Sequence, residues 1–458
     1  MAKNKTNYAY IEKIIYSSHF RNMQDKTQLF YSAPERQVRT RLTHTIEVKT
    51  IAYSIGNNIN KKLRKKLIDL DLVDAIAFAH DIGHTPFGHV GERTIDEIVS
   101  GKDSLGGMIP TGSPNKMRFK HNVNSLRLLQ ELDVQDWRIL DGALCHTRVF
   151  YKGDDYPYEK NPYNPFTESP SKFDRFFQEQ HGFLLEQTNR KKFHSLTLEG
   201  QIVAIADEIA QRVADISDGL ESRYFGVIKD ILAIGNDKKI STRLELEQII
   251  RKILIEDVVS NAAKNIKATV ATKETHRGII HDTYKTEVIC FSPKRKEQNE
   301  NLEKYITVMM AQSEDVRESD SRSKYIIRQL FKAYLNDISL LPDKFIDNYF
   351  RKIINKSSFI KAKAALRSAD KLREKSNVFE QIGNQSWRYR KGYLDKNKLV
   401  IDLRDVREFF TIIAKENNVH YIPELNDLLD EYTLQIGFHI AGMTNTEAFT
   451  AYNRIYGH

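Results

Sequence analysis

The most constraining feature of the sequence is a run of three histidines and two acids within residues 79–92, AHDIGHTPFGHVGE. His80 and Asp81 are adjacent, so they offer an imidazole nitrogen and a hard oxygen to one cation. Such a mixed set suits Mn, Fe or Mg better than it suits a structural zinc. The spacing of Leu72, Val73, Ile76 and Ala77 predicts an amphipathic helix over residues 67–80, whose apolar face His80 continues. This run therefore predicts a metal site at a helix end, which other segments have to complete.

Glycine and proline interrupt the helical pattern directly after the His-Asp pair. Gly83, Pro86 and Gly88 predict that the helix ends here. We therefore expect His84 and His89 on loop or turn backbone.

Two further helices carry candidate ligands. The pattern over residues 39–57 predicts a helix that contains His44, and the pattern over 198–220 predicts one that contains Asp207. A single helical histidine is more often a core or surface residue than a ligand, and a single aspartate is more often a cap or a surface acid. The small apolar residues before Asp207 favour a site instead. Gln211 and Asp215 follow it at four-residue spacing, which gives one polar line along the helix.

Charge and composition narrow the class of ligand and the compartment. The chain has 458 residues and a formal charge of +9, which favours polyanionic ligands such as nucleotides or nucleic acid. Its two cysteines are too few for a disulfide framework and favour the reducing cytoplasm. No segment approaches the roughly 18 apolar residues of a membrane helix, and no signal-peptide pattern precedes Tyr8. We expect a cytoplasmic protein without a membrane partner.

The remaining patterns predict an all-α protein with at most a short β element in the C-terminal half. The best strand candidate is TEVICFS over residues 286–292. Further helices are expected over 119–132, 325–334 and 399–415. A Tyr/Pro-rich loop over 151–170 leaves two interpretations open, the stacking of single-stranded bases and packing over the core or a neighbouring subunit.

The ordered set of motifs resembles the dGTP triphosphohydrolase branch of the HD-domain superfamily. The motifs that carry the resemblance are Ser17 to Arg21, Lys26 to Gln28, Arg39 to His44, residues 80–92, Phe119 to Asn122 with Ser125 to Arg127, Ala206 to Ala210, Asp215 to Gly219, and Ile440 to Thr444 with Ala448 and Tyr452. They cover the N-terminal half densely and the C-terminal half sparsely.

The resemblance implies one divalent metal ion per subunit (Mn, Mg or Fe) and a role for each histidine. The four ligands would be His44, His80, Asp81 and Asp207. His89 and Glu92 would form a catalytic dyad in which the carboxylate raises the basicity of the imidazole. On the sequence alone, Glu92 serves equally well as a carboxylate near a helix N-terminus. His84 and His121 would approach the phosphates or the leaving oxygen.

The resemblance also implies substrate contacts. Gln28, Asn122 and Asp215 match positions that contact the base or the sugar, with Asp215 near the 3′-hydroxyl. Arg41 would clamp a phosphate with its forked donors, and Lys172 would also reach a phosphate. Gln211 stands where relatives usually carry a tyrosine, so the contact made there differs.

The implied activity is metal-dependent hydrolysis of deoxynucleoside triphosphates, with dGTP as the expected substrate, to deoxynucleoside and tripolyphosphate. We expect an HD-domain catalytic core over residues 1–235, with loop insertions at 99–118 and 150–172. A helical region over 236–458 would serve oligomerisation and nucleotide binding. The implied partners are the dNTP substrate, a dNTP effector, single-stranded DNA and further copies of the chain in a tetramer or hexamer.

Two alternatives to this activity remain open. One is an HD phosphohydrolase that acts on nucleotide monophosphates, cyclic dinucleotides or alarmones. The other is a dNTP-sensing or single-strand-binding protein.

Overall fold

The structure is a computed structural model, and it describes residues 7–27, 39–109, 119–147, 194–219, 225–234, 242–276, 279–311, 314–337, 340–342, 344–346, 348–349 and 423–457. Gln28, Lys172, the expected helix over 399–415 and the Tyr/Pro-rich loop lie outside the described residues.

The chain forms two compact units that are not successive halves of the sequence. The first contains the described residues up to Gly88 and those between Lys120 and Ser321, and the second contains those from His89 to Phe119 and from Arg322 onward. The division into regions 1–235 and 236–458 stays a prediction.

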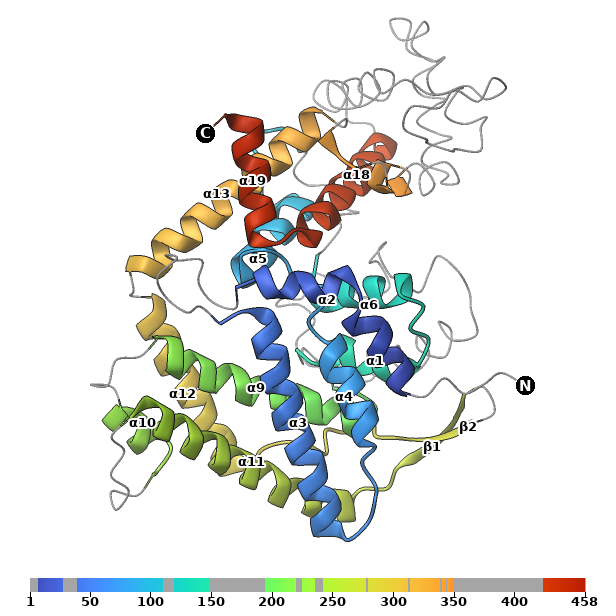
Figure 1. Ribbon diagram of the computed structural model, residues 1–458, viewed down its shortest axis with the longest axis vertical. Coiled ribbons are helices and arrows are strands. Elements are labelled where there is room, and N and C mark those ends of the chain that lie inside the picture. Colours follow the sequence, from blue (N-terminus) through green and yellow to red (C-terminus); the bar gives the residue numbers. More distant parts are fainter. Residues whose placement is uncertain are drawn as a thin grey trace, which may run out of the picture. The chain divides into compact units, whose positions relative to one another are not determined.

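The core of the first unit is built from five helices. The helix α3 (Arg41–Leu63) packs against α9 (Leu198–Gly219) and α4 (Leu70–Ala79), and α7 (Trp137–Cys145) and α11 (Arg243–Ala268) pack on α9 (Figure 1). The buried apolar side chains of α3 and α9 follow the helical period. They are Val48, Ala52, Ile55 and Ile59 on α3, and Ile202, Ile205, Ile209 and Val213 on α9. The remaining elements of this unit are α1 (Asn7–Ile15), α2 (Ser18–Asn22), η1 (Met23–Asp25), α6 (His121–Glu131), α10 (Phe225–Ile231) and α12 (Pro293–Ala311).

Capping side chains determine where the core helices begin. The Thr40 hydroxyl accepts from the Thr43 backbone N–H at the start of α3, and Asp69 accepts from Asp71 and Leu72 at the start of α4. Asp136 accepts from the backbone N–H of Arg138 at the start of α7. The caps of α3 and α4 thereby set the helical positions of His44 and His80.

The expected strand over residues 286–292 is wrong. This segment is irregular, and the strands are β1 (Thr272–His276) and β2 (Ile279–Thr283), an antiparallel pair that places Thr272 opposite Thr283. Side-chain amides, and not a neighbouring strand, bond to the backbone of residues 286–292. Gln201 accepts from the backbone N–H groups of Val288 and Ile289, at 2.7 and 3.0 Å.

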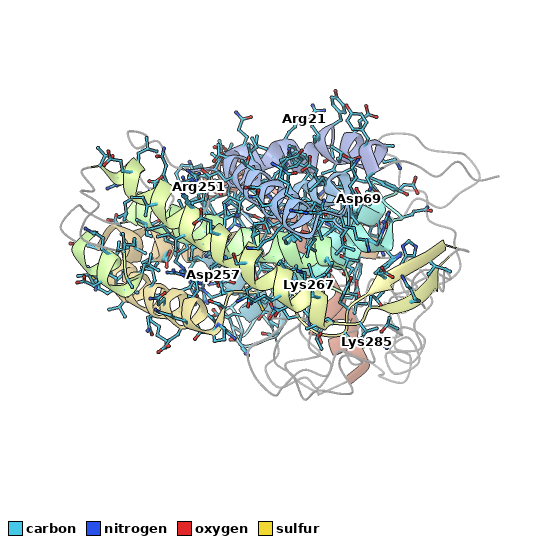
Figure 2. The ribbon with its side chains drawn as sticks, turned by 90° about the horizontal axis from the view of Figure 1, so that it is seen from below. Arg21, Asp69, Arg251, Asp257, Lys267 and Lys285 are labelled. Carbon is cyan, nitrogen blue, oxygen red and sulfur yellow. The ribbon has the colours of Figure 1, made fainter. Side chains whose placement is uncertain are left out.

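The helix α11 holds the same irregular segment from its other side. Asn265 donates to the Val288 carbonyl, and Asp257 accepts from both the N–H and the hydroxyl of Ser292. Figure 2 shows α11 lengthwise with Asp257 labelled near its middle and Lys267 toward its end. Val288 and Ile289 are buried, so the apolar pattern reports burial, while the amides of α9 and α11 satisfy the backbone.

The second unit contains α5 (Gly88–Val99), α13 (Glu314–Asn336), α18 (Pro423–Gly442) and α19 (Asn445–Tyr456). The residues of α13 from Arg322 onward contact the other three helices. Lys324 pairs with Glu97 of α5 at 2.8 Å. The Tyr432 hydroxyl of α18 donates to the Tyr334 carbonyl, and the Tyr456 hydroxyl of α19 donates to the Gln329 carbonyl.

The all-α prediction is confirmed, since the described residues form helices and one two-stranded sheet in the C-terminal half. Within the described ranges, every helix is too short or too polar to cross a bilayer.

Candidate metal centre

Three of the predicted ligands come together in the first unit. Ligand atoms of His44, His80 and Asp207 all lie within 4.8 Å of one another. His44 comes from the first turn of α3, His80 from the end of α4 and Asp207 from the middle of α9. The His44 Nε2 lies 2.8 Å from the Asp207 Oδ1, and the His80 Nε2 lies 4.0 Å from the same oxygen.

The arrangement of His80 fits a metal ligand. Its Nδ1 donates to the Ala77 carbonyl at 2.7 Å, so the neutral ring presents a lone pair at Nε2. That Nε2 is buried and has no hydrogen-bond partner among the described residues. Backbone carbonyls orient metal-binding imidazoles in the same manner. A divalent cation would also replace the proton that His44 and Asp207 share here.

Both predicted carboxylate ligands are ionised. Burial by itself would raise the pKa of Asp207, but the hydrogen bond and charge of His44, with His80 and His146, lower it below its ordinary value. Burial would likewise raise the pKa of Asp81, yet the adjacent Arg41 guanidinium and the neighbouring histidines hold it well below its usual range. Both groups are therefore charged at neutral pH and can bind a cation.

Asp81, the fourth predicted ligand, belongs to a neighbouring group of side chains that could hold a cation. Its Oδ2 accepts from Arg41 Nη1 at 2.7 Å, and its Oδ1 lies 3.8 Å from His121 Nε2. The ligand atoms of Asp81, His121 and His146 all lie within 4.8 Å of one another. Arg41, which we expected to clamp a phosphate, is 3% exposed and pairs with this carboxylate.

The helix α6 fixes the backbone of the His-Asp pair. The Ser125 hydroxyl donates to the His80 carbonyl at 2.9 Å and accepts from the Gly83 N–H, and the Asn124 amide donates to the Gly83 carbonyl. A Cβ at Gly83 would lie 2.2 Å from the Ser125 backbone nitrogen, so only glycine permits this approach.

Two family models match the chain. The HD domain matches residues 41–212, and the phosphohydrolase-associated domain matches residues 289–355. The first match begins in the first turn of α3 and contains all four predicted ligands. Residues 41–212 of the chain therefore form an HD domain.

Similar proteins carry names that point in the same direction. Proteins named deoxyguanosinetriphosphate triphosphohydrolase-like from Bartonella henselae, Rickettsia felis and Geobacter sulfurreducens are 29%, 26% and 26% identical to this chain. These matches span 73%, 72% and 73% of this chain, and 78%, 80% and 78% of the respective relatives. The matches support a nucleotide phosphohydrolase that binds a divalent metal.

His84 lies on irregular backbone, as expected. Its ring stacks on His121 with the centroids 4.4 Å apart, and its Nδ1 accepts from the Thr85 N–H. The proton of the neutral ring is therefore on Nε2, which makes that atom a hydrogen-bond donor. The buried Lys26 ammonium donates to the His84 carbonyl and holds the backbone here.

The expectation that His89 lies on loop or turn backbone is wrong. Phe87 and Gly88 have φ values of 59° and 60°, and this turn leads directly into α5, so His89 is in the first turn of the helix. His89 is exposed, Glu92 is 3% exposed, and a ring nitrogen and a carboxylate oxygen of the pair lie within 4.8 Å. Both residues belong to the second unit, and their catalytic role stays a prediction.

The other residues of the polar line on α9 differ in environment. Gln211 is half-buried, and Asp215 is 5% exposed with its Oδ2 3.6 Å from Arg212 Nη1. Arg212 also pairs with Asn299 and Glu303 of α12. Asp215 is thus fixed in place, and its contact with a sugar stays a prediction.

Asn122 is completely buried and joins α6 to the end of α7. Its amide nitrogen donates to the Leu144 carbonyl at 2.7 Å, and its oxygen accepts from the Val123 N–H. These bonds give Asn122 a structural role, and its expected contact with the base or sugar stays a prediction.

The site residues expected from the sequence do not include His146 and Ser125, which lie next to the predicted ligands. His146 is 3% exposed, and its ring lies 5.0 Å from that of His80. Burial, with the neighbouring His80 and His121, lowers the pKa of His146 to about 3. In the sequence, His146 stands in Cys145-His146-Thr147 without a metal-ligand spacing to the other histidines.

Proposed function

We propose that this HD-domain protein hydrolyses deoxynucleoside triphosphates, with dGTP as the preferred substrate, to deoxynucleoside and tripolyphosphate. The observation that carries the proposal is the group of His44, His80 and Asp207, two buried histidines and a partly exposed aspartate brought together from three helices. The relatives of this chain are named deoxyguanosinetriphosphate triphosphohydrolase-like. A water molecule would attack the α-phosphorus, and the bond from that phosphorus to the 5′-oxygen of the deoxynucleoside would break.

His44, His80, Asp81 and Asp207 would hold one divalent ion, and the identity of that ion, Mn, Mg or Fe, is part of the proposal. When bound, the ion would neutralise charge on the polyphosphate and polarise the phosphorus that is attacked. The residues of the chain would supply position and proton transfer. Lys26 and Ser125 would keep the His80–His84 turn rigid through the bonds that they make to its carbonyl groups.

Proton transfer would fall to the histidines that are not ligands. His89 and Glu92 are three residues apart on α5, so the buried carboxylate would orient the imidazole and raise its basicity. His84 would donate from Nε2 to a phosphate oxygen, because Thr85 occupies its Nδ1. Asp215 would accept from the sugar 3′-hydroxyl, with Arg212 holding the carboxylate in place.

The identity of the phosphate product tests this proposal directly. Each dNTP is incubated with the protein and Mn²⁺ or Mg²⁺, and the products are separated by ion-exchange chromatography. Tripolyphosphate and deoxynucleoside are expected, with the fastest release from dGTP. Orthophosphate or pyrophosphate would instead favour another HD phosphohydrolase, and the matching monophosphate, cyclic dinucleotide and alarmone substrates are tested in parallel.

The proposed partners are tested with the same protein. We propose a homo-oligomer, a tetramer or hexamer, which light scattering detects, and a dNTP effector, which would change the rate with a second dNTP. Single-stranded DNA binding is examined as a function of salt, because phosphate contacts weaken steeply as salt rises. DNA affinity that survives Asp81→Ala in a protein without dNTP turnover would favour a binding protein over an enzyme.

A further inference from the structure

The ends of α3 and α11 carry an exposed set of cations that the proposed function does not use. Lys62 in the last turn of α3 donates to the Ser260 hydroxyl of α11 at 2.9 Å, so the two helix ends lie side by side (Figure 1). We call this set the basic surface, and its seven exposed members are Lys61, Lys62, Arg64, Lys65, Lys66, Lys264 and Lys267.

The chain does not compensate the charge of the basic surface. Residues 48–68 and 258–273 contain no aspartate or glutamate. In the described part of the chain, none of the seven cations pairs with a carboxylate. Earlier on the same helices the cations are paired, Lys49 with Asp74 and Lys252 with Glu256. The charge of the basic surface is therefore directed to solvent, where it attracts polyanions.

The negative ends of the two helices account for only a small part of this charge. A helix C-terminus carries about half a negative charge, which lysine and arginine stabilise. Two helix ends together amount to about one charge, whereas the basic surface has seven cations. Lys65 and Lys66 also lie beyond Leu63, where α3 ends. A ligand with several negative charges is needed to match the remainder.

Arg64 places a cation where the backbone favours glycine. It caps α3 with a φ of 51°, in the left-handed region, and its N–H bonds to the carbonyls of Asn60 and Lys61. Glycine adopts this conformation without a steric cost, and arginine does not. Stability alone would therefore favour glycine at this position, and the exposed guanidinium points to a contact outside the chain.

We propose that the basic surface binds the phosphate backbone of a nucleic-acid duplex. The axes of packed helices lie about 8–10 Å apart, so the cations of α3 and α11 form two neighbouring rows. A duplex likewise presents two rows of phosphates, on either side of grooves about 6 and 12 Å wide. A single strand presents one row, and its binding sites add aromatic side chains on which the bases stack. Residues 54–77 and 258–275 contain no phenylalanine, tyrosine or tryptophan, which favours the duplex.

An anionic membrane surface is the alternative partner. Interfacial binding uses apolar side chains that enter the bilayer in addition to charge. Within residues 54–68 and 258–273, the only exposed large apolar side chain is that of Val270. One valine provides little apolar area, so charge alone would have to hold a membrane, and the two rows of cations favour the duplex.

The salt dependence of duplex binding tests the proposal. Binding of the full-length protein to a labelled DNA duplex is measured by fluorescence anisotropy between about 50 and 200 mM salt. The slope of log affinity against log salt should be about −3.6 or steeper, as four or more phosphate contacts require. Lys65→Glu/Lys66→Glu should weaken binding by about tenfold or more and make the slope shallower by about 2.

A second double variant controls for the change in net charge. Lys252→Glu/Lys296→Glu alters two exposed lysines of α11 and α12 outside the basic surface and changes the net charge equally. Its affinity for the duplex should stay within about twofold of the wild type. Equal affinities of the two double variants would overturn the inference. So would tighter binding to a single strand of the same sequence, or binding to phosphatidylserine vesicles in place of the duplex.

Arg64→Gly separates a contact with the duplex from a structural role. The glycine relieves the left-handed backbone, so Tm should rise, while duplex binding should weaken by about threefold. A cation that only stabilises the helix end would give the reverse, a lower Tm with unchanged affinity, and this result would contradict the proposal. Turnover of dNTPs should be unchanged in all of these variants. The inference therefore goes beyond the proposed function, and either can fail without the other.

Discussion

The first unit contains two polar clusters that share α9. The structural cluster comprises Asp141, Ser195, Thr197 and Gln201, and the metal-site cluster comprises His44, His80 and Asp207. In the structural cluster, Asp141 accepts from the Ser195 hydroxyl and the Leu196 N–H, and Thr197 accepts from the Gly200 N–H. The Gln201 amide bonds to four backbone groups.

The metal-site cluster is somewhat less buried, since the Asp207 side chain is 20% exposed, and the protein does not satisfy all of its polar atoms. His80 is 0% exposed, yet its Nε2 has no hydrogen-bond partner within the described part of the chain. A buried polar atom without a partner costs about 1–3 kcal/mol. The structural cluster therefore stabilises the fold, while the metal-site cluster leaves that cost to be offset by a ligand. The two clusters therefore differ mainly in hydrogen bonding, because the metal-site cluster contains a buried nitrogen, His80 Nε2, without a partner in the described part of the chain.

The largest expected effect is the loss of metal and activity in His80→Ala. We expect kcat/KM to fall by more than about 10³-fold, which exceeds the effect of losing one electrostatic contact in other active sites, together with loss of bound Mn²⁺. The free energy of unfolding of the metal-free protein should fall less than it does in Asp141→Ala. Normal turnover with unchanged metal content would contradict the assignment of His80 as a ligand.

A smaller loss of rate is expected for Glu92→Ala. This variant should keep its metal, because no predicted ligand is changed, and should lose about 10²-fold or more in kcat, the range of general acid–base catalysis. Glu92→Gln is the matched variant, since the amide has the same shape but cannot raise the basicity of His89. A rate close to that of the wild type in both variants would refute the dyad.

Altering the structural cluster should lower the stability of the fold and leave metal binding and activity unchanged. Asp141→Ala removes the acceptor for Ser195 and Leu196, so we expect a loss of about 2 kcal/mol in the free energy of unfolding. Metal content and the rate per folded molecule should stay unchanged. Asp141→Asn, which keeps the acceptor oxygen, is the control and should be destabilised less. Loss of bound metal in a folded Asp141→Ala variant would mean that the two clusters are not independent.

The sequence predicts the helices better than it predicts the partners of their side chains. Helical apolar spacing indicated α4 and α9 to within a few residues and α3 without its last six, because each helix buries one face against the others. It also indicated His44, His80 and Asp207, since each stands in such a helix. The segment over 286–292 was mistaken for a strand because Val288 and Ile289 are buried, and nothing local shows that Gln201, far away in sequence, bonds to their backbone.

His146 was missed for a related reason. The neighbours of a histidine ring depend on the direction of the side chain. For His146, that direction depends on the bond from Nδ1 to the Ala143 carbonyl and on the approach of α6 to α7 through Asn122. Neither interaction leaves a spacing that can be recognised in sequence. The Gly83 contact with α6 is of the same kind, because a glycine in a turn does not name the backbone that it approaches.

The smallest expected effect concerns His439 of α18, a histidine outside both clusters. Burial lowers the pKa of His439 to about 4, and its ring lies edge-on to Tyr334 and tilted against Phe345. Between pH 6.5 and about 4, the unfolded chain therefore binds a proton that the folded chain excludes, and stability falls as the pH falls. The loss between pH 6.5 and 5.5 should be about 1 kcal/mol, and it should be absent in His439→Leu.

The measurement is the difference in the free energy of unfolding between pH 6.5 and 5.5, for the wild type and for His439→Leu, by denaturant titration of metal-free protein. The same pH dependence in both proteins would contradict the burial of a neutral His439. The result bears on the comparison of the clusters because His146 also has a lowered pKa, and burial is the main cause for both residues. A lowered histidine pKa therefore reports mainly burial and does not by itself mark a metal ligand. What sets His146 apart is that its Nε2 is directed by the Ala143 carbonyl toward a second imidazole and the carboxylate of Asp81, whereas His439 faces aromatic rings.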